Sequence, residues 1–141
     1  MPEPRQIAPA TGKLGVLLPG LGAVASTLIA GVMTARRSGE APIGSVSQMA
    51  HIRLGNRGEA RNPLIRDFVP LASLDDLVFG GWDPISANVL EAARTSGVLE
   101  ERDLAPISAE MEGIVAMEAV FDRHWVSRLD GFRVMTGASK M

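Results

Sequence analysis

The stretch of sequence that decides the fold covers residues 14–27 and reads LGVLLPGLGAVAST. The apolar run over residues 14–18 predicts a short buried strand, and the Gly-x-Gly-x-x-Ala pattern after it predicts a tight turn into a helix. Gly20 would allow the sharp turn, Gly22 would let a phosphate approach the backbone, and Ala25 would let the helix pack close to the strand. Unpaired N–H groups and the dipole at the start of such a helix favour an anion, so the layout is typical of a dinucleotide site.

The same region has a rival interpretation as a membrane segment. Residues 14–35 form an uncharged stretch that is long enough to cross a bilayer. Arg5 and Lys13 precede this stretch, as basic residues precede the apolar part of a signal peptide or anchor. Helix-breaking residues interrupt the middle of the stretch: Pro19, Gly20 and Gly22. Because Arg36 and Arg37 follow directly, the flanking charges also give little inside/outside contrast, and the nucleotide interpretation is favoured.

Composition narrows the class of protein further. The chain has 141 residues, of which 46% are hydrophobic, so one domain with a real core is expected. A net charge of −2 gives no reason to expect nucleic acid as a partner. The chain has no cysteine, which excludes disulfides, thiol nucleophiles and Cys-based zinc sites and fits the cytosol. His51 and His124 stand alone rather than at a metal-ligand spacing, so we expect no metal site.

The order of predicted elements indicates an α/β fold. From the N-terminus we expect a loose arm over 1–12, a strand at 14–18 and a helix at 23–37 stopped by Gly39. A strand within 44–54, a turn over 55–63 and a strand at 77–79 broken by residues 80–84 should follow. The last predicted elements are a helix at 87–96 capped by Ser86 and ended by Gly97, a helix at 103–116 and a strand at 117–121. This order predicts a Rossmann-like parallel sheet with flanking helices over 13–141. The last residues form no further element, so the fold is expected to be truncated at its C-terminus.

Asp83 is the second candidate site residue. It lies just past a predicted parallel strand, at the sheet edge where open α/β folds hold ligands, and its carboxylate could accept hydrogen bonds from a ribose. A simple Asp-Pro turn or helix cap is an equally good interpretation. The usual ribose-binding acid about 20 residues past the fingerprint is not evident. Ser45, Ser47 and Gln48 occupy that region instead.

Other polar groups carry weaker signals. Ser26 is interpreted as a turn residue that faces a phosphate rather than as a nucleophile. Four arginines recur through the next segment: Arg53, Arg57, Arg61 and Arg66. A phosphate site is conceivable there, but the interleaved Gly and Asn residues favour a solvated loop.

Several segments together resemble the myo-inositol-phosphate synthases. The first two are the fingerprint at residues 20–27 and the block at 43–55. The strongest is residues 76–83, DLVFGGWD, followed by 87–93 and 98–100. The Gly-Trp-Asp element is distinctive in this context, and the resemblance keeps its order through nearly the whole chain.

The resemblance implies an NAD-dependent isomerase of inositol and phospholipid biosynthesis. Such enzymes convert D-glucose 6-phosphate into 1D-myo-inositol 3-phosphate by oxidation at C5, aldol cyclisation and reduction. By this resemblance, Gly22, Ala23, Val24 and Asp83 would contact NAD, and Gly20 and Leu21 would shape the loop. The expected cofactor site is therefore Gly20, Leu21, Gly22, Ala23, Val24, Ala25, Ser26 and Asp83. A cytoplasmic homotetramer without nucleic acid or membrane partners is also implied for the whole enzyme.

Two departures restrict what carries over. Many members have a longer loop with an asparagine pair after the second glycine, whereas this chain reads Ala23-Val24-Ala25. Members are also several times longer, and their catalytic lysines lie in the part that follows, so neither Lys13 nor Lys140 matches one. We expect the N-terminal NAD-binding portion only, without catalytic residues and inactive alone. The alternative is another NAD(P)-binding oxidoreductase or a regulatory nucleotide-binding module.

Overall fold

The computed structural model describes residues 8, 11–121, 124, 126–128, 131 and 133–135. Two compact units make up the chain: Met1–Leu14 with Ala35–Leu77, and Gly15–Thr34 with Val78–Met141. The expected arm over 1–12 lies largely outside the described residues. Among the described residues, no helix is both long enough and apolar enough to span a membrane.

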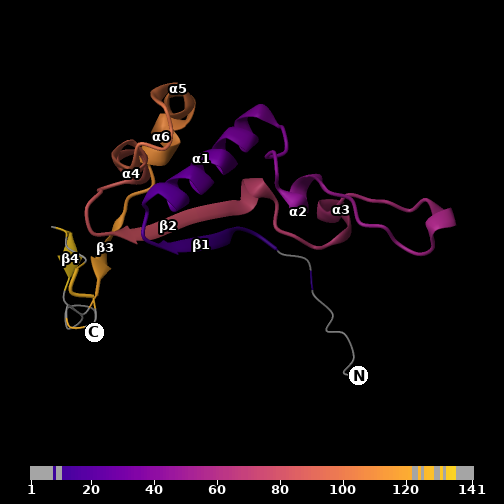
Figure 1. Ribbon diagram of the computed structural model, residues 1–141, viewed down its shortest axis with the longest axis horizontal. Coiled ribbons are helices and arrows are strands. Elements are labelled where there is room, and N and C mark those ends of the chain that lie inside the picture. The colour runs from indigo at the N-terminus through magenta and orange to yellow at the C-terminus, as the bar shows by residue number, and fades with distance from the viewer. Residues whose placement is uncertain are drawn as a thin grey trace. The chain divides into compact units, whose positions relative to one another are not determined.

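The second unit is built on a parallel sheet. Its strands are β1 (Leu14–Pro19), β2 (Leu77–Asp83), β3 (Met117–Val120) and β4 (Val134–Met135), and they lie in that order across the sheet (Figure 1). β2 and β3 pair in parallel with Trp82 opposite Met117, and β3 and β4 pair in parallel with Ala119 opposite Val134. The predicted parallel α/β fold is thus confirmed, as are strands at 14–18 and 117–121.

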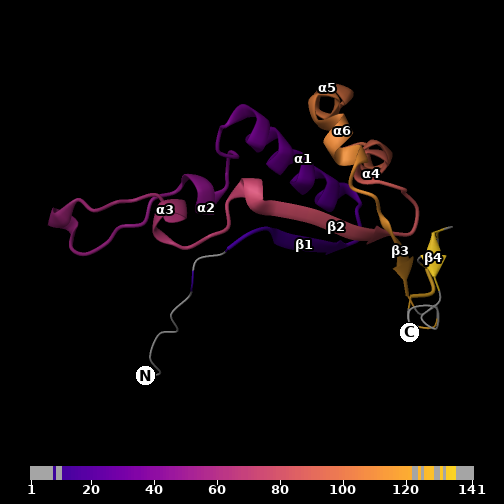
Figure 2. The same cartoon turned by 180° about the vertical axis from the view of Figure 1, so that it is seen from behind.

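The strand order decides on which face of the sheet the helices of this unit lie. They are α1 (Ala23–Ser38), α4 (Val89–Ser96), α5 (Glu101–Leu104) and α6 (Ser108–Glu112). Since each strand is placed next to its predecessor, right-handed crossovers bring the connecting helices to the same face of the sheet. Both views show α1 lying along β1 and β2 (Figures 1 and 2).

This one-sided cover decides where the core lies. Leu21 and Ile29 are fully buried between α1 and the sheet, where Phe79 is also buried. On the opposite face, Leu17 is 62% exposed and Val78 is 52% exposed. The expectation of a buried strand at 14–18 is therefore wrong, because β1 lies at the edge of the sheet with only one face covered.

The first unit contains no strand among its described residues beyond the ends of β1 and β2. It holds α2 (Val46–Met49), α3 (Ile65–Phe68) and a hairpin between them, in which Ile52 N donates to Pro63 O at 3.0 Å. The predicted strand within 44–54 is wrong. Gly44 turns the chain at a φ of +85°, and Met49 N donates to Ser45 O at 2.9 Å in the helical turn that follows.

Two helix predictions also need correction. The helix expected at 87–96 begins two residues later, and Asn88 rather than Ser86 caps it by accepting from Glu91 N at 2.9 Å. Gly97 ends it with a φ of +64°, as predicted. The single helix expected at 103–116 is instead a series of short pieces, α5, a 3₁₀ turn over Ala105–Ile107 and α6. Pro106 has no N–H to donate, which interrupts the helical ladder there.

The glycine pair in β2 does not break the strand. We expected residues 80–84 to interrupt it, but β2 continues through Gly80 and Gly81 and ends at Asp83. A glycine inside a strand permits another backbone or side chain to approach closely. The strand ends where Pro84 can no longer donate a ladder hydrogen bond.

Candidate functional site

The turn between β1 and α1 has the geometry that its glycines predict. Gly20 adopts a φ of +107°, which residues with a side chain rarely adopt. Its N–H donates to the carbonyl oxygen of Trp82 at 2.9 Å, so the turn is tied to the end of β2. This bond holds the turn at the carboxyl edge of the sheet.

The start of α1 is open to a ligand. Ser26 N donates to Gly22 O at 3.0 Å, so the N–H groups of Ala23, Val24 and Ala25 precede the first intrahelical bond. Among the described residues these three N–H groups have no backbone acceptor. A Cβ added to Gly22 would meet nothing within 4 Å. The turn therefore presents unpaired N–H groups beside free space, which suits an anion.

Two residues of the fingerprint face inward instead. Ala25 is 8% exposed and Ser26 is fully buried. The Ser26 hydroxyl donates to Gly22 O at 3.0 Å and lies 3.3 Å from Ala23 O. Its polar atom is thus engaged within the first turn of α1, and a contact of this side chain with a phosphate stays a prediction.

Asp83 is a buried carboxylate with three backbone donors. Its Oδ1 accepts from Ile85 N at 2.8 Å and from Ser86 N at 2.6 Å, which is the turn geometry expected of an Asp-Pro sequence. Its Oδ2 accepts from Leu21 N at 3.3 Å. Asp83 is 7% exposed and its Oδ2 keeps acceptor capacity, and its contact with a ribose stays a prediction.

Gly81 is a site residue that sequence reasoning missed. A Cβ at this position would lie 2.5 Å from Leu18 O and 2.6 Å from Leu21 Cδ2. Only a glycine at position 81 therefore lets the turn pack against β2. The available signal was a glycine inside a strand pattern, which marks close approach as well as a break.

An apolar cavity of about 360 Å³ lies beside the turn. Residues at the carboxyl ends of β1, β2 and β3 line it: Pro19, Gly20, Trp82, Pro84, Ala119, Val120 and Phe121. In open α/β sheets this edge is where ligands bind, and apolar walls suit a planar ring. Sequence reasoning missed the cavity because its lining comes from three strands that only the fold brings together.

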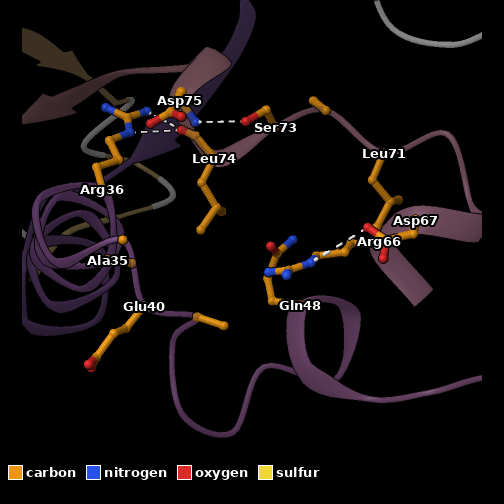
Figure 3. Close-up of a pocket in the computed structure, with 13 residues that line it drawn as sticks. Ala35, Arg36, Glu40, Gln48, Arg66, Asp67, Leu71, Ser73, Leu74 and Asp75 are labelled. Carbon is orange, nitrogen blue, oxygen red and sulfur yellow. Dashed lines mark hydrogen bonds and ion pairs between the residues drawn. The ribbon is translucent and has the colours of Figure 1, made fainter. Parts of the chain in front are cut away.

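The other unit has a cavity of its own, of about 390 Å³ (Figure 3). Arg36 donates into its wall, with Nε 2.8 Å from Leu74 O, and Arg66 forms an ion pair with Asp67 at 3.7 Å. Of the four arginines considered above, only Arg66 lines this cavity; Arg53, Arg57 and Arg61 are exposed on the hairpin. The structure does not gather them into a phosphate site.

Metal-binding side chains are not clustered in the part of the chain that the structure describes. No group of three His, Cys, Asp or Glu residues there could hold an ion. The backbone of His51 pairs with Leu64 in the hairpin.

Comparison with known proteins identifies the family. The family model for the NAD-binding domain described as myo-inositol-1-phosphate synthase matches residues 14–141. The chain is 45% identical over 137 residues to inositol-3-phosphate synthase 1 of Bacteroides thetaiotaomicron, covering 96% of this chain and 31% of that protein. It is 34% identical to inositol-3-phosphate synthase isozyme 1 of Arabidopsis thaliana, covering 91% of this chain and 28% of that protein.

A solved structure shows the same fold. The crystal structure of inositol-3-phosphate synthase from Caenorhabditis elegans superposes with a TM-score of 0.66 at 24% identity, covering 90% of this chain and 28% of that one. The chain thus spans about three-tenths of the length of the relatives that it matches. The resemblance and the NAD cofactor drawn from sequence are confirmed at the level of the family, and the chain belongs to the myo-inositol-1-phosphate synthase family as its N-terminal NAD-binding portion.

Proposed function

We propose that this chain supplies the NAD-binding part of an inositol-3-phosphate synthase. The observation that carries the proposal is the open start of α1, where N–H groups that have no acceptor in the described part of the chain adjoin free space in front of Gly22. The names of the relatives, together with this geometry, support a role in making 1D-myo-inositol 3-phosphate from D-glucose 6-phosphate. Such a role would place the protein in inositol and phospholipid biosynthesis, as an NAD-dependent isomerase.

The residues of the turn would divide the work of holding the dinucleotide. The N–H groups of Gly22, Ala23 and Val24 would bind the pyrophosphate, helped by the dipole of α1. Gly20 and Leu21 would shape the turn, and Ala25 and Ser26 would support it from the buried side of α1. Asp83 would contact the adjoining ribose through the free capacity of Oδ2.

The neighbouring apolar cavity would receive the ring half of the cofactor. Its apolar walls, with Trp82 and Phe121, would cover one side of that ring. Bound NAD would supply reversible hydride transfer at C5 of the sugar phosphate. We assign ring closure to lysines in the part of the family's members that this chain does not cover, so this chain alone would be inactive.

The whole enzyme is proposed to work as a cytoplasmic homotetramer on a sugar phosphate, with no membrane or nucleic-acid partner. A net charge of −2 gives no basis for binding nucleic acid. The exposed apolar residues on the uncovered face of the sheet, Leu17 and Val78, support burial of that face in a larger assembly.

Calorimetric titration of the purified chain with NAD tests the proposal. We expect saturable binding that Gly22→Val weakens at least roughly tenfold, because its side chain would occupy the space that the phosphate needs. Gly58→Val is the matched control, since a Cβ there also meets nothing within 4 Å but lies on the hairpin. Equal weakening by both variants, or no binding by a folded chain, would overturn the proposal. A preference for NADP would favour a different oxidoreductase.

A further inference from the structure

The end of β2 contacts the glycine turn through three consecutive residues. Gly81 leaves room for Leu21, Trp82 O accepts from Gly20 N at 2.9 Å, and Asp83 Oδ2 accepts from Leu21 N at 3.3 Å. The turn therefore takes its shape from residues about 60 positions further along the chain. Of the three contacts, only that of Asp83 comes from a charged side chain.

Asp83 links this turn to a second one. Its Oδ1 accepts from Ile85 N and Ser86 N in the connection between β2 and α4, while its Oδ2 holds Leu21 N. Hydrogen bonds from N–H groups to a carboxylate are stronger than those between neutral groups. With a side chain that is 7% exposed, the carboxylate has little freedom to leave either turn.

We propose that Asp83 is a positioning residue: by holding Leu21 N–H, it orients the glycine turn so that the following N–H groups face an incoming pyrophosphate. The inference rests on the proposed function, since it assigns a ligand to that turn. It differs from a ribose contact, because the effect reaches the phosphates through Leu21. The N–H of Leu21 is bonded inside the protein, whereas those of Gly22 and Ala23 have no acceptor among the described residues and are left for a ligand.

Asp83→Asn separates the two hydrogen bonds to Oδ1 from the one to Oδ2. The amide oxygen can stay with Ile85 N and Ser86 N, which are the shorter contacts. The amide NH₂ then faces Leu21 N–H, and two donors cannot bond to each other. Asp75→Asn is the matched control, because Asp75 is an exposed carboxylate in the other unit.

The test combines amide NMR with two ligands, NAD and inorganic pyrophosphate, which has no ribose. In the wild-type chain, Leu21 N–H should exchange with solvent more slowly than Gly22 N–H. In Asp83→Asn its proton resonance should shift upfield, and affinity for both ligands should fall roughly tenfold. Asp75→Asn should change none of these values.

Each other result is decisive. Loss of NAD affinity with unchanged pyrophosphate affinity would assign Asp83 to the ribose and overturn the inference. An unchanged Leu21 resonance in a folded Asp83→Asn variant would overturn the inference. Leu21 exchange in the wild-type chain as fast as that of Gly22 would also overturn it, and that measurement holds even if Asp83→Asn fails to fold. If the wild-type chain bound neither ligand, the proposed function would fail, and the positioning of a ligand site would fail with it. Slow exchange of Leu21 N–H in that chain would still show that its hydrogen bond to Asp83 is present.

Discussion

Gly81 and Leu21 meet so closely that no side chain fits between them: a Cβ on Gly81 would lie 2.6 Å from Leu21 Cδ2 and 2.5 Å from the carbonyl oxygen of Leu18. Leu21 is fully buried and cannot swing outward without exposing its side chain. The second clash is with backbone, which yields less readily than a flexible side chain. The packing of β1, β2 and the glycine turn therefore depends on this one glycine.

Gly81→Ala is predicted to destabilise the chain by about 1–3 kcal/mol, the usual cost of overpacking a buried site. Urea unfolding followed by circular dichroism measures it. Gly80→Ala is the control in the same strand, because its Cβ would meet only Leu17 Cδ2, at 3.3 Å, on the exposed face. Equal midpoints for Gly81→Ala and the wild-type chain would show that the turn does not pack on β2 as described.

Gly20→Ala is predicted to cost about 1–3 kcal/mol for a different reason, namely backbone strain at a φ of +107°. A Cβ at Gly20 would meet nothing within 4 Å, so crowding does not contribute. Thermal unfolding should show the loss, and Gly22→Ala, at a residue without a positive φ, should leave the melting temperature nearly unchanged. The prediction fails if both variants melt with the wild-type chain.

Sequence reasoning found the parts of this molecule that depend on local chemistry. The turn around Gly20 and the stop of α4 at Gly97 follow from backbone freedom, and both adopt a positive φ. The parallel order followed from alternating strands and helices. The family resemblance also followed from short motifs in a fixed order, because each motif is local.

Features that depend on distant contacts could not be predicted in the same way. Gly80 and Gly81 look like a break until the fold places Leu18 and Leu21 against Gly81. The exposure of Leu17 depends on which face of the sheet the helices cover, which strand order decides rather than strand sequence. Asp83 was found as a candidate, but its bond to Leu21 joins residues 62 positions apart.

Asn88→Ala is predicted to destabilise the chain by about 0.5–2 kcal/mol by removing the N-cap of α4. Asn88 accepts from Glu91 N at 2.9 Å, and Glu91 in turn accepts from Ala87 N at 2.7 Å, so the start of the helix has two such bonds. Chemical denaturation checks the value. Ser45→Ala is the control, because Ser45 precedes α2 without a side-chain cap bond and should have little effect.

The ion pair between Arg94 and Glu101 should make the stability of the fold depend on pH in the acidic range. Arg94 Nε donates to Glu101 Oε2 at 3.1 Å. This side-chain hydrogen bond, with the opposite charge of each partner, lowers the pKa of Glu101 and raises the pKa of Arg94. A carboxyl whose pKa is lowered on folding contributes stability above its unfolded pKa and loses it as the pH falls through its folded pKa.

Replacing Arg94 tests that linkage directly. In Arg94→Gln, the pKa of Glu101 should rise toward its ordinary value, and the loss of stability at acidic pH should shrink. Carbon NMR of the Glu101 carboxyl during a pH titration measures this pKa. Arg102→Gln is the control, because Arg102 pairs with Glu100 at 2.9 Å and should leave the pKa of Glu101 alone. Since both partners are exposed, added salt should move the wild-type pKa in the same direction as Arg94→Gln does. A pKa of Glu101 that is the same with and without Arg94 would show that the pair does not persist in solution.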